Sequence, residues 1–174
     1  MVIMRWVLIG AGVLLGLAAL VAAAGYAMPN AHVAQVEAEY RADLDSVYSV
    51  IADVESWPDW HPSVSRLIPL ETEDERPAWR ITGPDGSMTL AITERDPPRR
   101  LTTLADGGMF VGRWTYRLQE HEGGTRLTVT EEARIDNPLV RGLTLFWSQT
   151  ATMERFLRAL GEQLGETVEP RALT

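Results

Sequence analysis

The order of apolar and polar positions divides the chain into four parts. Residues 6–27 form an apolar run without a charged side chain, and this run matches the roughly 20 residues of a helix that crosses a bilayer. A short helical segment follows, then a series of segments with alternating polarity, and last a stripe of apolar residues at helical spacing. This order predicts an N-terminal transmembrane helix ahead of one α+β domain.

The apolar run has two interpretations. Arg5 stands directly before it, so the positive-inside tendency predicts a single-pass membrane protein with a cytoplasmic N-terminus and an extracytoplasmic domain. The triplets at 22–24 and 25–27 also resemble signal-peptide cleavage sites, and cleavage there would release a secreted domain. The length of the run favours a retained anchor.

Segments of alternating polarity predict an antiparallel sheet of about seven strands. The first is at 32–40, and the others are at 65–71, 78–83, 87–94, 99–105, 111–121 and 125–135. Glycine, proline and aspartate separate the later strands, as hairpin turns require. Between the first two strands, residues 43–60 predict a short helical pair that Asp43 can cap and Pro58 ends.

Residues 137–164 predict one long closing helix of about 40 Å, at 1.5 Å per residue. Asn137 can cap this helix, Pro138 suits its first position, and apolar residues follow every three or four positions. We therefore expect an anchor and linker at 1–30, a ligand-binding domain at 31–166 and a frayed C-terminal tail at 167–174.

The composition excludes several kinds of chemistry. The chain has no Cys and no Lys, so it has no thiol nucleophile, thiolate metal site or Schiff-base lysine. Its three His residues lack the spacing of zinc ligands, and we expect neither a metal nor a cofactor. After residue 30 the chain carries 24 acidic residues against 15 Arg, a net charge of −9 that disfavours nucleic acid as a partner.

Four segments together resemble a known family: 43–67 (DLDSVYSVIADVESWPDWHPSVSRL), 92–101 (ITERDPPRRL), 114–138 (WTYRLQEHEGGTRLTVTEEARIDNP) and the closing helix. Over residues 33–165 their order is similar to that of the START-like (SRPBCC) superfamily, in its polyketide cyclase/dehydrase and lipid-transport group. The resemblance implies a helix-grip fold, in which a curved antiparallel sheet surrounds the C-terminal helix and an apolar cavity. Members of the superfamily bind lipids, sterols, polyketides or hormones, and some are enzymes, so the resemblance specifies the fold more narrowly than the activity.

Three side chains are candidates for acid–base chemistry. Glu94 and Glu131 continue the apolar alternation of their strands, so each carboxyl is expected to face the cavity, where burial raises a pKa. The alternative is that both lie at solvated strand ends and pair with arginine. His61, in the loop after Trp60, serves as a base or ligand contact in one interpretation and is an ordinary surface-loop histidine in the other.

Ligand contacts are expected from inward-facing residues of the loop, the strands and the closing helix. These are Trp60, Trp79, Met88, Leu90, Ile92, Phe110, Trp114, Tyr116, Leu127, Val129, Phe146, Thr150 and Met153. Aromatic residues at strand and helix periods also serve simply as core, so each has a packing role as its alternative.

Three functions follow from these observations. The first, which we favour, is membrane-anchored binding or transport of a small hydrophobic ligand or lipid between the sheet and the closing helix. The second is a cyclase, dehydratase or hydrolase that uses a cavity carboxylate as acid or base. The third is an interaction module whose core is filled by its own aromatic side chains, and a cavity below about 300 Å³ would favour it.

Overall fold

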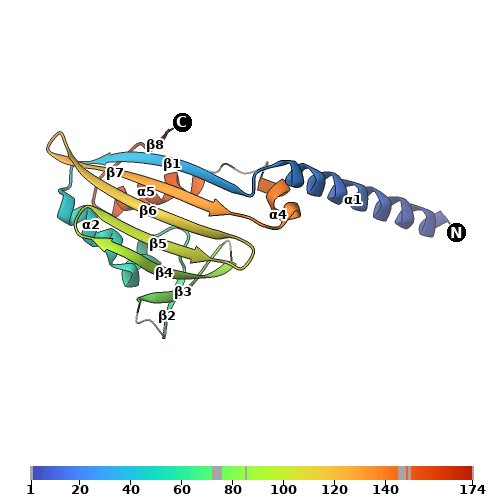
Figure 1. Cartoon of the computed structure of the whole chain (residues 1–174), viewed down its shortest axis with the longest axis horizontal. Coiled ribbons are helices and arrows are strands. Elements are labelled where there is room, and N and C mark those ends of the chain that lie inside the picture. The colour runs from blue at the N-terminus through green and yellow to red at the C-terminus, as the bar shows by residue number, and fades with distance from the viewer. Residues whose placement is uncertain (1, 72–75, 85, 145–147, 149, 174) are drawn as a thin grey trace.

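A computed structural model of the chain describes residues 2–71, 76–84, 86–144, 148 and 150–173. Helix α1 (Val2–Ala27) projects from one end of an α+β domain (Figure 1). It contains a segment, Met4–Ala27, that is long and apolar enough to cross a membrane. The predicted N-terminal helix is therefore present.

The domain is built on one antiparallel sheet with the strand order β2-β3-β4-β5-β6-β7-β1-β8. All seven predicted strands are confirmed, with small changes at their ends. They are β1 (Ala31–Tyr40), β2 (Arg66–Leu70), β3 (Ala78–Gly83), β4 (Gly86–Asp96), β5 (Arg100–Asp106), β6 (Val111–His121) and β7 (Gly124–Arg134). An eighth strand, β8 (Arg171–Leu173), is not among the predicted ones.

The helical pair after the first strand is also confirmed. It consists of α2 (Leu44–Ala52), a 3-10 turn η1 (Val54–Ser56) and α3 (Trp57–Trp60). The Asp43 carboxylate accepts a hydrogen bond from the Ser46 amide at 2.8 Å, which satisfies one of the free N–H groups at the start of α2. Val47 and Ile51 are fully buried, so α2 packs its apolar side against the domain core.

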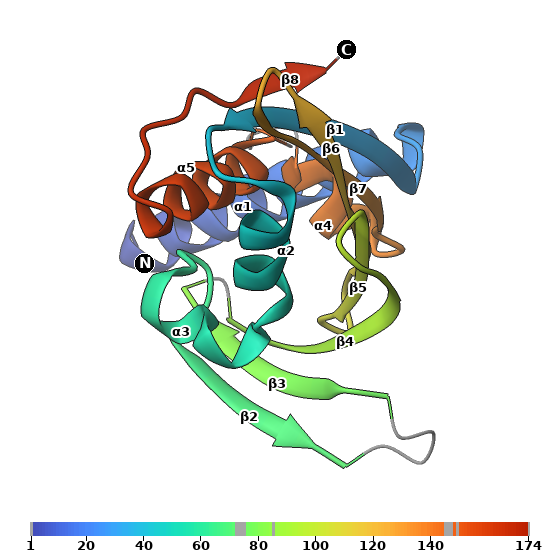
Figure 2. The ribbon, with the colours of Figure 1, turned by 90° about the vertical axis from the view of Figure 1, so that its left-hand side faces the viewer.

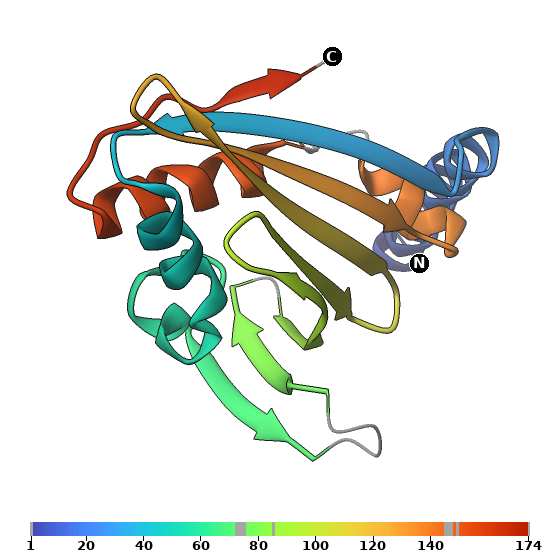
Figure 3. The same ribbon diagram turned by 60° about the vertical axis from the view of Figure 1, so that its left-hand side comes forward.

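The C-terminal helix is confirmed, but its predicted continuity over residues 137–164 is wrong. Among the residues that the structure describes in this range, there are two helices, α4 (Pro138–Leu143) and α5 (Ala151–Gln163), and Ser148 and Thr150 between them are not helical. Thr150 stands at the start of α5, where its hydroxyl donates to the Glu154 carboxylate at 2.8 Å. The two helices also have different partners, because α4 lies against α1 while α5 packs under the sheet (Figures 1 and 3).

The C-terminal tail is ordered, contrary to the expected fraying. Gly165 ends α5 with a φ of 72°, a conformation that glycine adopts freely. The Glu166 carboxylate then accepts hydrogen bonds from the backbone amides of Arg41 and Ala42, and Val168 is buried. These contacts direct the chain to the sheet edge, where β8 pairs with β1 as an eighth strand.

Helix α5 lies across one face of the curved sheet, with α2 and α3 beside it (Figure 2). Its inward side chains are fully buried: Met153, Phe156, Leu157 and Leu160. The Tyr40 hydroxyl of β1 donates to the Leu157 carbonyl at 2.9 Å, which fixes the helix to the sheet. This arrangement is the predicted helix-grip fold.

Candidate ligand cavity

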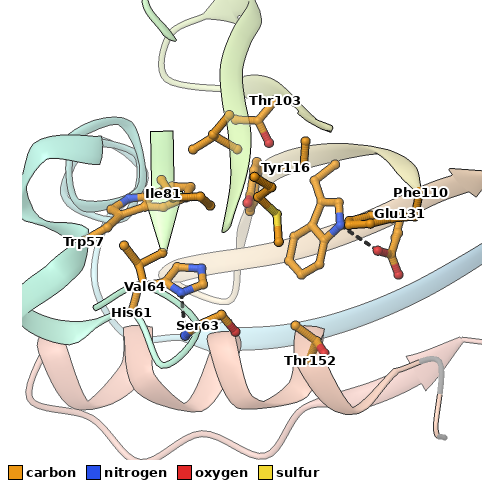
Figure 4. Close-up of a pocket in the computed structure, with 14 residues that line it drawn as sticks. Trp57, His61, Ser63, Val64, Ile81, Thr103, Phe110, Tyr116, Glu131 and Thr152 are labelled. Atoms are coloured by element: carbon orange, nitrogen blue, oxygen red, sulfur yellow. Dashed lines mark hydrogen bonds between the residues drawn. The ribbon is translucent and has the colours of Figure 1, made fainter. Parts of the chain in front are cut away.

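An apolar cavity of about 200 Å³ lies between the sheet and α5 (Figure 4). It occupies the part of the sheet where β1 begins, β6 begins and β7 ends, which is the end that carries α1 (Figure 1). Its lining residues are Trp57, His61, Ser63, Val64, Ile81, Met88, Leu90, Thr103, Ala105, Phe110, Trp114, Tyr116, Glu131 and Thr152.

The strand register sets the central wall of the cavity. Trp114 of β6 lies opposite Thr103 of β5 and opposite Glu131 of β7, so the three side chains form one row across the sheet. The Trp114 Nε1–H donates to Glu131 Oε1 at 2.8 Å (Figure 4). Phe110 closes the adjacent hairpin, with its ring 3.0 Å from the position that a Cβ on Gly112 would occupy.

Glu131 is the carboxylate of this wall. Its side chain is only 15% exposed, and His32 Nε2 lies 3.9 Å from Oε2. Burial raises the pKa of Glu131 above its usual range, while the Trp114 hydrogen bond and the charge of His32 act in the opposite direction. The prediction that Glu131 faces the apolar side of the sheet is correct.

His61 lies on the other side of the cavity, in the loop after α3. Its ring stacks on Trp57 with a centroid distance of 4.8 Å, and it is 8% exposed. Nδ1 accepts a hydrogen bond from the Ser63 amide at 3.1 Å, so a neutral ring carries its proton on Nε2. Burial lowers the pKa of His61 to about 4, and the ring is therefore neutral at physiological pH.

Ser63 and Tyr116 supply two further polar groups. Among the described residues, Ser63 Oγ is buried without a hydrogen-bond partner, although a buried hydroxyl usually has one. The phenol of Tyr116 is fully buried, and this burial raises its pKa although the hydroxyl of Thr103 opposes the shift. The cavity thus combines an apolar interior with a neutral imidazole, a neutral phenol, an unpaired hydroxyl and one carboxylate.

The structure brings seven of the predicted site residues together around the cavity: His61, Met88, Leu90, Phe110, Trp114, Tyr116 and Glu131. Five others are packed in the core outside it: Trp79, Ile92, Leu127, Val129 and Met153. Trp60 packs partly buried against that core, with its ring 5.7 Å from Phe156. Thr150 occupies the N-cap position of α5, where its hydroxyl bonds to the Glu154 side chain rather than to the helix backbone, and Phe146 is outside the described residues.

Glu94 does not face the cavity, so the predicted parity is wrong at this position. The pairing of β4 with β5 slips by one residue, since Ile92 lies opposite Thr103 but Glu94 lies opposite Thr102. Such a bulge reverses which face the following side chains point to. Glu94 accepts a hydrogen bond from Arg100 at 2.6 Å on the outer face of the sheet.

Several lining residues are absent from the predicted site. Thr103 and Ala105 alternate with Leu101 along β5, and Ile81 alternates with Trp79 along β3, so the alternation used for the other strands would have found them. Ser63 lies in a loop, where no periodic signal exists. Trp57, Val64 and Thr152 complete this group.

Solved structures share this fold at low sequence identity. TTHA0849 from Thermus thermophilus is 20% identical with a TM-score of 0.63, over 76% of this chain and 97% of that chain. Ms6760 from Mycobacterium smegmatis is 19% identical with a TM-score of 0.55, over 76% and 90%. The di-domain ARO/CYC protein StfQ of the steffimycin biosynthetic pathway is 16% identical with a TM-score of 0.58, over 76% of this chain. The present chain spans 52% of StfQ.

The sequence itself assigns the family. No curated protein matches the chain. The family model described as polyketide cyclase / dehydrase and lipid transport matches residues 31–165, which is the entire sheet up to β7 together with α5. The chain therefore belongs to the polyketide cyclase/dehydrase and lipid-transport family.

Proposed function

We propose that the protein is a membrane-anchored carrier or sensor that binds a small hydrophobic ligand, or one segment of a lipid, between the sheet and α5. The observation that supports this function best is the apolar cavity with the unpaired hydroxyl of Ser63 inside it. A buried hydroxyl without a partner is unfavourable by roughly 1–3 kcal/mol. A ligand with a hydrogen-bonding group would remove that penalty.

The cavity volume limits the ligand. About 200 Å³ is below the roughly 300 Å³ at which drug-sized pockets begin, because Trp57 and Phe156 fill part of the space. The volume alone thus favours the filled-core alternative, whereas the polar groups favour a ligand. An apolar cavity of about 150 Å³ is large enough for benzene, so this cavity suits one ring or a short acyl segment.

The proposed location is the extracytoplasmic face of a membrane, with α1 retained as the anchor. Helix α1 has the length and composition of a membrane span, and Arg5 precedes its apolar stretch, which favours a cytoplasmic N-terminus. An anchored cavity would stay beside a reservoir of lipids.

Binding to the full-length protein in detergent tests the function. A fluorescent short-chain fatty acid is titrated, with tryptophan quenching as the signal, because Trp57 and Trp114 line the cavity. The variant Ala105→Phe places a ring inside the cavity and should weaken binding at least tenfold, which is about 1.4 kcal/mol. Ala91→Phe is the matched control, because Ala91 lies opposite Leu104 on the outer face of the same sheet.

Equal affinities of the two variants would remove support for a ligand in this cavity. Native mass spectrometry of protein extracted gently from its own membrane gives an independent answer. A bound lipid or metabolite would identify the ligand class, and the intact mass would show whether residues 1–27 are retained.

The alternative is an enzyme that acts on a hydrophobic substrate. Glu131 favours it, since a buried carboxyl with a raised pKa beside an apolar cavity suits general acid–base catalysis. In that case Glu131→Gln would abolish turnover but preserve binding. Unchanged turnover would exclude the residue.

A further inference from the structure

Helices α1 and α4 meet in close backbone contact. A Cβ added at Gly25 would overlap the Pro138 carbonyl oxygen, and a Cβ added at Gly142 would overlap the Val21 carbonyl oxygen. Small residues on both helices are the usual way in which helices approach so closely in membranes. The small residues near the end of α1, which resemble a signal cleavage site, thus have a packing role.

Arg141 of α4 ties this contact to the domain. The residue is 8% exposed, and its Nε–H donates to the Gly25 carbonyl at 2.6 Å. Its Nη1 donates to the Ile135 carbonyl at 2.7 Å, just after β7. The Gly25 carbonyl also accepts a longer hydrogen bond from the Met28 amide, at 3.3 Å. One guanidinium therefore binds a carbonyl in the last turn of α1 and holds the chain that leaves the sheet.

The contact lies at the level where α1 would leave the bilayer. Trp6 and Tyr26 are both exposed on α1, and the 20 residues from one to the other span about 30 Å of helix. That distance equals the thickness of the hydrocarbon core, about 30 Å, and tryptophan and tyrosine concentrate at its two boundaries. Val21 and Gly25, which contact α4, lie within about one and a half turns of the Tyr26 boundary.

The outward side of α4 is apolar at this same level. Leu139 and Leu143, one helical turn apart, are 41% and 38% exposed, whereas Arg141 and Gly142 are buried. A short helix that buries its arginine and exposes its leucines is arranged for an apolar environment rather than for water. Met109, in the β5–β6 hairpin at the same end of the domain, is 65% exposed.

We propose that α4 is a docking helix that locks the domain onto the end of α1 and rests its Leu139 and Leu143 face on the bilayer surface. The occupant of that face is lipid, because the face is continuous with the membrane span. This inference rests on the proposed membrane anchorage but not on the proposed ligand binding. It assigns the domain one orientation, with the cavity in the half of the sheet nearest the membrane.

Spin labels in the full-length chain test the proposal, and the absence of native Cys makes each label unique. Leu139→Cys and Leu143→Cys are labelled in phosphatidylcholine nanodiscs, and collision rates with oxygen and with a water-soluble nickel reagent are compared. Glu120→Cys, exposed at the opposite end of β6, reports water. We expect oxygen to dominate at 139 and 143 and the nickel reagent to dominate at 120.

The role of the helix contact is tested by placing Gly25→Leu in each labelled chain. The labels at 139 and 143 should then move from oxygen to nickel preference, because a side chain at Gly25 separates α4 from α1. Gly16→Leu is the matched control, since a Cβ at Gly16 has no neighbour within 4 Å. Arg141→Gln, which adds no bulk, should move the labels in the same direction as Gly25→Leu.

Nickel preference at 139 and 143 in the chain with both glycines intact would overturn the proposal. So would labels that keep their oxygen preference in both Gly25→Leu and Arg141→Gln. Fatty-acid binding, measured in the same nanodiscs, separates this result from the proposed function. If the protein binds no fatty acid but the labels at 139 and 143 prefer oxygen, the result counts against the ligand alone. If it binds fatty acid but the labels prefer the nickel reagent, the result counts against the docking helix alone.

Discussion

The two halves of the space beneath the sheet are built differently. In the half away from α1, the inward residues are large and aliphatic and are fully buried, as with Leu101, Leu118 and Leu127. Toward α1 the same strands continue inward with Ala105 on β5, Gly112 on β6 and Glu131 on β7. The first half is solid core, whereas the second contains the cavity.

The comparison shows how one sheet forms both a solid core and a cavity. Leucine at every inward position would close the space at core density. Small and polar residues instead occupy the positions of β5, β6 and β7 nearest α1, and they leave a cavity whose position is fixed by the solid half. The cavity therefore follows from the size of the side chains at these positions.

The largest expected effect is the loss of a core leucine. Leu127→Ala removes a fully buried side chain from the solid half and should lower the free energy of unfolding by about 2–5 kcal/mol. Met88→Ala, at the cavity wall, should lower it by only about 1–2 kcal/mol, because its atoms already border a void. Urea denaturation of the full-length protein in detergent measures both, and equal losses would contradict the comparison.

The next effect concerns His61 at the cavity wall, whose neutral form is favoured by burial. A pKa lowered from 6.5 to about 4 means that the unfolded chain binds a proton between these pH values while the folded chain does not. Stability should therefore fall by about 3 kcal/mol as the pH drops through this window, at about 1.4 kcal/mol for each pKa unit.

His61→Phe keeps the aromatic stack and removes the titration. The variant should show a much flatter stability profile between pH 6.5 and pH 4, measured by thermal unfolding. A parallel decline in the two proteins would mean that His61 is not the responsible group.

Most of the fold follows from periodicity, because the strands carry one apolar face and the turns carry glycine and proline. The site is predicted less completely, for reasons of geometry. The one-residue slip between Ile92 and Glu94 turns the Glu94 carboxylate, which is predicted to face the cavity, outward. The sequence has no glycine or proline at this point that would indicate a bulge. Glu131 follows an unbroken alternation, so the same reasoning places it correctly.

The sequence predicts one closing helix because Leu139 and Leu143 continue the apolar period of α5. In the structure these two leucines are exposed on the outer side of α4, whereas the leucines of α5 are buried under the sheet. Periodicity reports that a side chain avoids water. It does not report whether that side chain contacts the protein core or another apolar environment. The need for glycine at position 142 is likewise visible only in the structure, where Val21 of α1 lies against it.

Replacing a small inward residue by leucine should change the free energy of unfolding by a smaller amount, and in opposite directions in the two halves. Ala38→Leu adds atoms to a position that is 3% exposed in the solid half and should destabilise the protein by about 1–3 kcal/mol. Ala105→Leu adds them to the cavity and should stabilise it by roughly 0.5–2 kcal/mol. Thermal unfolding without added ligand distinguishes the two, and destabilisation by both variants would show that the cavity is not available space.

The smallest expected effect concerns Glu131, the buried carboxylate of the cavity half. Because burial raises the pKa of Glu131, its charged form opposes folding above that pKa, and stability is gained as the pH falls through it. Glu131→Gln keeps an oxygen for the Trp114 hydrogen bond and should be more stable than the parent protein at pH 8. The two should converge at pH 4, below the usual carboxyl pKa of 4.5, where the charge is lost in the folded and unfolded chains alike. Glu94→Gln makes the same change on the outer face beside Arg100, so a gain in that variant, or one in Glu131→Gln that persists at pH 4, would show that the cavity is not its cause.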